Sequence, residues 1–195
     1  MRDGITLYFV RHGETDWNAE RRYQGQRDIP LNAKGREQAR RNGQTLATAA
    51  ATLFAAKFVA SPLGRARETM EILRAEMGLP VSDYTLEDRL KELSYGTWEG
   101  QLQDELPQVD PGSWSARSLD PYRWRPHGGE SYADLLKRSA GWLASVEHDT
   151  VVASHGGVSR CLRGHVLGLD PASIPELESP QDRVLVLTSR GMSWL

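Results

Sequence analysis

The hydrophobic residues of the chain follow two alternating patterns. Four short runs are mainly apolar and rich in β-branched residues, as is typical of buried strands: 5–10, 57–60, 150–153 and 183–188. Four longer segments have apolar residues at every third or fourth position, which predicts helices with one buried face: 33–53, 62–77, 130–147 and 157–167. Alternating strands and helices favour an α/β fold with three layers, in which helices cover both faces of a mostly parallel central sheet.

The predicted boundaries of the first two helices rest on capping residues. Asn32 can cap the helix whose apolar stripe runs from Ala39 through Ala50 to Leu53. Ser61 and Pro62 provide a cap and a first helical residue for the next helix. We therefore expect that helix to begin directly after the strand at 57–60.

The region 101–129 interrupts this alternation. Prolines and two tryptophans break its pattern: Pro107, Pro111, Trp114, Pro121, Trp124 and Pro126. We predict a single domain over 1–195, in which 101–129 is an irregular insertion and a candidate lid over a binding site.

Composition and charge exclude several classes of protein. The 195 residues are 39% hydrophobic and 26% charged, which is typical of a soluble globular domain. A net charge of −2 argues against a nucleic-acid partner, and no stretch approaches the roughly 20 apolar residues of a membrane span. The N-terminal residues lack the pattern of a signal peptide, so a cytoplasmic location is expected. A homodimer is the default oligomer.

Polar residues that could take part in catalysis or ligand binding follow the predicted strands. They lie in four stretches: Arg11-His12-Gly13-Glu14-Thr15 with Asn18, Ser61-Pro62-Leu63-Gly64-Arg65-Ala66, Glu92-Leu93-Ser94-Tyr95-Gly96, and Ser154-His155-Gly156-Gly157. Open α/β sheets bind ligands at the carboxyl ends of their strands, so these stretches are expected to meet in one site. Taken together and in this order, they resemble the histidine phosphatase superfamily, also called phosphoglycerate mutase-like, across nearly the whole chain.

The residue types suit phosphate chemistry. Arg11 and Arg65 each offer paired N–H donors that match the oxygens of a phosphate monoester. Two guanidinium groups also disfavour the protonated form of His12, and only a neutral imidazole can attack phosphorus. The resemblance implies that His12 accepts the phosphoryl group and that water then hydrolyses the phosphohistidine.

The resemblance assigns roles to two further catalytic residues. His155 is expected to donate to the transferring phosphoryl group from the start of a helix, where Gly156 allows close backbone approach. Glu92, in Glu-x-x-Tyr-Gly, is expected to protonate the leaving oxygen, with Glu14 as a competitor for this role.

The remaining pocket residues are also predicted from the resemblance. The expected substrate-binding residues are Gly13, Glu14, Thr15, Asn18, Gln24, Gly25, Tyr95 and Gly156. We expect no metal and no cofactor, since two histidines lack a third close ligand and the neighbouring arginines would repel a cation.

Three functions remain open. The first is a metal-independent phosphatase acting on a small phosphorylated metabolite. The second is a cofactor-dependent phosphoglycerate mutase, although Leu93 stands where the mutases have an arginine, 96–105 contains no lysine, and the insertion lacks paired arginines. The third is a non-catalytic domain that binds a phosphorylated ligand. Fructose bisphosphates, phosphoglycerates, the ribazole phosphate of cobalamin synthesis and phosphoproteins are all open as substrates.

Overall fold

A six-stranded sheet forms the centre of the protein within the residues that the computed structural model describes, 1–49, 53 and 55–195. Its strands are β1 (Leu7–Arg11), β2 (Lys57–Ala60), β3 (Thr85–Leu86), β4 (Thr150–Ser154), β5 (Val184–Thr188) and β6 (Gly191–Trp194). They lie in the order β3-β2-β4-β1-β5-β6. The first four of these are mutually parallel, and β5 and β6 are antiparallel to their neighbours. The predicted mostly parallel α/β fold is confirmed, while β3 and β6 were not predicted.

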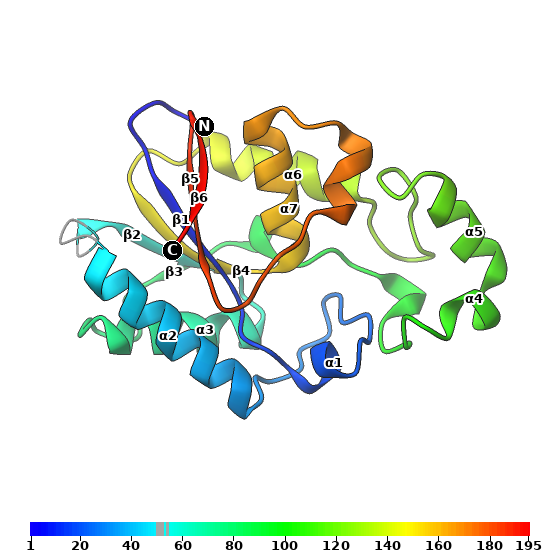
Figure 1. The fold of residues 1–195 in the computed structure, drawn as a ribbon, viewed down its shortest axis with the longest axis horizontal. Helices are drawn as coiled ribbons and strands as arrows, with labels where there is room; N and C mark the ends of the chain where they lie inside the picture. Colours follow the sequence, from blue (N-terminus) through cyan, green and yellow to red (C-terminus); the bar gives the residue numbers. More distant parts are fainter. Residues whose placement is uncertain (50–52, 54) are drawn as a thin grey trace.

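Helices cover both faces of this sheet (Figure 1). The α-helices of the described residues are α1 (Asp16–Ala19), α2 (Ala33–Ala49), α3 (Gly64–Glu76), α4 (Leu106–Val109), α5 (Pro111–Leu119), α6 (Tyr132–Ala144) and α7 (Gly156–Leu167). Helices α2 and α3 pack together on one face, and α6 and α7 pack together on the other. The three-layer arrangement is therefore confirmed. Among the described residues, no helix is both long and apolar enough to cross a bilayer.

The alternation of side chains along β1 supplies both halves of the core. Leu7 and Phe9 point into the cluster beneath α6 and α7, whereas Val10 belongs to the cluster beneath α2 and α3. This is the period of two that a strand imposes on its side chains. Central strand β4 is buried along its whole length, because helices cover both of its faces.

The two predicted helix caps have different outcomes. The side chain of Asn32 accepts a hydrogen bond from Gly35 N–H at 2.9 Å and so caps α2 as expected. The prediction for α3 was wrong, because this helix begins at Gly64 and Leu63 occupies its cap position. Ser61 instead lies 2.7 Å from the imidazole of His155. The predicted stripe residue Ala50 lies outside the described residues.

The region 101–129 is more regular than predicted, since it contains α4 and α5, which extend to one side of the sheet (Figure 1). Pro107 and Pro111 lie in the first turns of these helices, where a missing N–H costs nothing. Six apolar side chains, which we call the aromatic cluster, anchor the region: Tyr23, Tyr95, Trp98, Leu106, Trp114 and Trp124. It is a small core of its own.

Candidate active site

Three neighbouring parallel strands deliver polar side chains to the same edge of the sheet. Arg11 and Ser154 are partners in the register of β1 and β4. The residues that follow them, His12 and His155, therefore lie side by side, with their ring centroids 5.2 Å apart. Ser61 follows β2 in the same way and reaches His155. The sheet register thus brings together residues that are more than 140 positions apart.

A cavity of about 140 Å³ opens beside these residues. Its lining is almost entirely polar and comprises Arg11, His12, Asn18, Arg22, Tyr23, Gln24, Gly25, Arg65, Glu92, Tyr95, Gln103, Gly156 and Arg160. Four arginines face a single carboxylate in this lining. The cavity is therefore suited to an anion.

A larger hollow, of about 500 Å³, lies at the opposite edge of the sheet, where β2 and β4 begin at Lys57 and Thr150. Its buried arginine, Arg74, already donates to the carbonyl oxygen of Pro80 at 2.6 Å and lies over the ring of Phe58. The smaller cavity is the candidate active site, because it gathers a histidine with several arginines at the carboxyl ends of the strands.

The imidazole of His12 is fixed in orientation and is only 2% exposed. Its Nδ1 lies 2.7 Å from the carbonyl oxygen of Gly13, which can only accept, so Nδ1 carries the proton. Nε2 is then the basic nitrogen, and Arg65 Nε donates to it at 3.3 Å. The lone pair of Nε2 is thus directed to the guanidinium of Arg65, which lines the cavity beside it.

Burial lowers the pKa of His12 well below the ordinary value, and the charges of Arg65 and Arg11 lower it further. Burial likewise lowers the pKa of His155, with Arg65 as the next cause. Both imidazoles are therefore neutral near pH 7. This is the state that His12 needs to act as a nucleophile.

Backbone oxygens hold the two predicted phosphate-binding arginines. Arg65 donates from Nη1 to the carbonyl oxygen of Arg27 at 2.6 Å and from Nη2 to that of Gly25 at 2.7 Å. Arg11 donates from Nη1 to the carbonyl oxygen of Ser179 at 2.5 Å. Burial lowers the pKa of each arginine to about 10, so both remain charged at neutral pH.

Buried donors remain available to a ligand. Arg11 Nε and Gln24 Nε2 have no hydrogen-bond partner among the described residues. A buried N–H without a partner carries a desolvation cost of about 1–3 kcal/mol, which an oxyanion would remove. Both side chains line the cavity.

The carboxylate of Glu92 lies against the first turn of α7. Its two carboxylate oxygens each accept from Gly157 N–H at 3.2 Å, and one accepts from Leu93 N–H at 2.8 Å. A Cβ at Gly157 would lie 2.4 Å from Glu92 Oε1, so a side chain at this position would displace the carboxylate of Glu92. The contact fixes Glu92 at the wall of the cavity.

Most of the other predicted residues line the cavity, and two of them lie behind its lining. Asn18 donates to Gln24 Oε1 at 3.3 Å, and Thr15 donates to the same oxygen at 2.9 Å. Thr15 also caps α1. Asn18, Gln24, Gly25, Tyr95 and Gly156 line the cavity, whereas Thr15 and His155 lie behind its lining.

Gly13 and Glu14 lie away from the cavity lining. A Cβ on Gly13 would lie 2.1 Å from the carbonyl oxygen of Gly35, so this glycine allows the segment that follows β1 to approach α2 closely. Glu14 binds Lys34 Nζ at 2.7 Å. The hydrogen bond from Lys34 lowers the pKa of Glu14, which makes it a poor proton donor and favours Glu92 in that role.

The sequence prediction missed several residues of the cavity. They are Arg22, Tyr23, Gln103 and Arg160. Arg160 could have been found, because it follows Gly156 by four positions and so lies on the same face of α7. Arg22 and Gln103 gave no local signal, because a bridge between Arg22 and Leu102 brings their two segments together. Gln181 was also missed; it donates to the backbone oxygen of His12 at 3.0 Å.

Within the described part of the chain, no three His, Cys, Asp or Glu side chains are grouped so that they could hold a metal ion.

The lowered pKa values of the two histidines predict a loss of stability in mild acid. Below the ordinary value of 6.5 the unfolded chain binds protons that folded His12 and His155 do not. The free energy of unfolding should therefore fall by about 1 kcal/mol for each histidine as the pH drops from about 6.5 to 5.5. Urea unfolding at several pH values measures this slope.

Two variants test whether the buried histidines cause this pH dependence of the free energy of unfolding. His155→Gln should remove about half of the histidine slope, whereas His148→Gln, at an exposed position, should leave it unchanged. A free energy of unfolding that stays constant over this pH range would contradict the predicted neutral state of the two histidines.

The chain belongs to the histidine phosphatase superfamily (branch 1), whose family pattern it matches over residues 7–195. It is 38% identical over 170 residues to a probable phosphoglycerate mutase, GpmB, of Salmonella paratyphi C, covering 85% of this chain and 76% of that protein.

Solved structures with the same fold include two phosphatases. A mycobacterial glucosyl-3-phosphoglycerate phosphatase superposes with a TM-score of 0.80 at 29% identity, over 98% of this chain and 96% of the other. The alpha-ribazole phosphatase of Shigella flexneri superposes with a TM-score of 0.81 at 25% identity, over 97% and 94%. Similar proteins thus carry both mutase and phosphatase names.

Proposed function

We propose that the protein is a metal-independent phosphatase that hydrolyses phosphate monoesters through a phosphohistidine on His12. The observation that carries this proposal is the neutral, buried imidazole of His12, whose basic Nε2 lies 3.3 Å from the guanidinium of Arg65. A nucleophile and an anion-binding group are thus already in contact. The four polar stretches that predicted the family converge on this point.

The first chemical step forms a bond from His12 Nε2 to phosphorus and breaks the ester P–O bond. Glu92, carrying a proton, transfers it to the departing oxygen, so the leaving group departs as an alcohol. The guanidinium groups of Arg11 and Arg65 stabilise the negative charge of the phosphoryl oxygens. In the second step water attacks the phosphohistidine, Glu92 accepts a proton from this water, and His12 is regenerated as inorganic phosphate is released.

The cavity supports a small phosphorylated metabolite as substrate and water as the acceptor. Arg22 and Arg160, the two lining arginines beyond those assigned to phosphate, are engaged by the protein. Arg22 binds Glu20 and the backbone oxygen of Gly100, and Arg160 binds the hydroxyl of Tyr132. Water as the acceptor is favoured because Leu93 stands where the mutases have an arginine and 96–105 contains no lysine.

Phosphotransfer between two hydroxyl groups is the second candidate function. It is favoured by the similarity to a probable phosphoglycerate mutase at 38% identity. The two reactions share the phosphohistidine and differ in the acceptor. They are separated by following free phosphate and isomerised product in the same sample of phosphoglycerate.

We expect turnover of phosphate monoesters to persist in excess chelator, because His12 and the arginines supply the nucleophile and the charge stabilisation. The measurement is release of inorganic phosphate from a panel of metabolite phosphates and from 4-nitrophenyl phosphate, with and without the chelator. Loss of turnover that a divalent cation restores would contradict metal independence. Isomerised product that forms faster than free phosphate would favour the mutase.

A further inference from the structure

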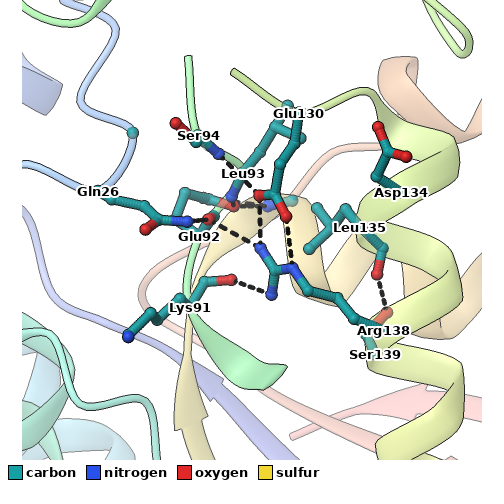
Figure 2. Close-up of polar contacts among 12 residues, drawn as sticks. Gln26, Lys91, Glu92, Leu93, Ser94, Glu130, Asp134, Leu135, Arg138 and Ser139 are labelled. Carbon is teal, nitrogen blue, oxygen red and sulfur yellow. Dashed lines mark hydrogen bonds and ion pairs between the residues drawn. The ribbon is translucent and has the colours of Figure 1, made fainter. Parts of the chain in front are cut away.

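Arg138 of α6 has the most extensive set of side-chain contacts near the candidate active site (Figure 2). Its Nη1 donates to the carbonyl oxygens of Lys91 at 2.7 Å and Arg89 at 2.8 Å. Its Nη2 donates to the carbonyl oxygen of Glu92 at 2.9 Å. The two oxygens of Glu130 accept from Nε and Nη2, each at 2.9 Å. Every nitrogen of the guanidinium, Nε, Nη1 and Nη2, therefore donates a hydrogen bond within the protein.

The segment 89–94 depends on such contacts, because its carbonyl groups lie outside the sheet and the α-helices. Gln26 Nε2 also donates to the carbonyl oxygen of Glu92, at 3.0 Å, and Glu130 accepts from Ser94 N–H at 3.0 Å (Figure 2). Side chains from remote parts of the chain therefore fix this backbone in the way that a neighbouring strand would.

Glu92 is consequently held at two points. Its carboxylate is bound by Gly157 N–H at the start of α7, and its backbone is bound by Arg138 from α6. Two fixed points define the direction of the side chain between them. Removing the backbone contact would let the carboxyl group move relative to the cavity.

We infer that Arg138, held by Glu130, is a positioning residue that aims the carboxyl group of Glu92 at the leaving oxygen of the substrate. This inference rests on the proposed function, in which Glu92 supplies that proton. Arg138 lies outside the cavity lining, so it acts through Glu92 and not on the substrate. A misplacement of about 1 Å in a catalytic group can cost up to about 100-fold in rate.

The dependence of the rate on the leaving group tests this role. Glycerol phosphate releases an alkoxide that needs a proton, whereas 4-nitrophenyl phosphate releases a stabilised phenolate that does not. For Arg138→Met we expect kcat/KM to fall about 10- to 100-fold on glycerol phosphate and about twofold or less on the aryl phosphate. A purely structural role would lower both rates by the same factor, because it changes only the amount of folded enzyme.

Two further variants complete the comparison. Arg138→Lys keeps the charge but loses the fork, so an intermediate and equally selective loss is expected; it also serves if Arg138→Met does not fold. Arg125→Met is the matched control. It removes an exposed ion pair with Asp134, which lies on the same helix as Arg138, and it should change neither rate. Thermal unfolding of each variant fixes a temperature at which all are folded.

A double variant distinguishes positioning from an independent effect. In a Glu92→Gln background, Arg138→Met should cause no further loss on glycerol phosphate, because the group that it aims is already gone. Equal losses on both substrates, or losses that multiply in the double variant, would overturn the inference while leaving the phosphatase proposal intact. A wild-type enzyme that hydrolyses neither compound would overturn the proposed function and the positioning role together.

Discussion

Replacing His12 with Asn is expected to lower kcat by a factor on the order of 10⁴ or more and to abolish the covalent phosphoenzyme. Asparagine has about the size needed to fill the site but no basic nitrogen. The N–P bond cannot then form, and water would have to attack the ester directly. The remaining rate would come from the arginines, which still bind and polarise the phosphate.

Rapid quenching with a substrate labelled in its phosphoryl group measures the intermediate. Wild type should show labelled protein that is stable in base and loses its label in acid, whereas His12→Asn should show none. His148→Asn is the matched control, because that histidine is exposed, and it should label normally. Equal labelling of wild type and His12→Asn would show that the nucleophile lies elsewhere.

Replacing Arg65 with Met is expected to lower kcat/KM by about 10²- to 10³-fold, the usual cost of removing one donor that stabilises developing negative charge. The same change should alter the pH profile. The charge of Arg65 is the largest cause after burial of the lowered pKa of His12, so its removal raises that pKa. The acid limb of the pH–rate profile should therefore move to higher pH.

Arg65→Lys separates charge from geometry. Lysine retains the positive charge, so the acid limb should shift less than with methionine, but the paired donors are lost and kcat/KM should stay low. Arg36→Met is the control, since this arginine binds Glu68 on the surface side of the helices and should leave both quantities unchanged. A full rate with an unshifted profile in Arg65→Met would exclude this arginine from phosphate binding.

The sequence predicted the parts of the fold that have a periodic pattern. Short apolar runs predicted β1, β2, β4 and β5, and apolar residues at helical spacing predicted α2, α3, α6 and α7. Strand β3 was missed because it has only two residues, Thr85 and Leu86, and both are exposed. Helices α4 and α5 were missed because Pro107 and Pro111 suggest breaks in a chain, whereas here they begin helices.

For the candidate site, residues in short stretches after strands were predictable and residues held by remote contacts were not. The structure brings Arg11, His12, Arg65 and Glu92 around one cavity, although their catalytic roles remain predictions. Arg138 could not be found from the sequence, since it meets the backbone of Glu92 from 46 positions away. Such contacts are set by the packing of α6 and have no local pattern.

The aromatic cluster gives the predicted lid at 101–129 a core largely of its own. Apart from Tyr95, which also packs against the core beneath α6 and α7, its side chains belong to neither of the two clusters that hold the sheet. Of the cavity residues it includes Tyr23 and Tyr95. Helix α5, which is described along its whole length, fully buries none of its side chains. Substitutions in α5 should therefore leave the register of the strands that carry His12 and His155 unchanged. If the region 101–129 is the lid that the sequence predicts, retargeting the protein to another phosphorylated compound is an engineering problem confined to a short, outlying part of the chain.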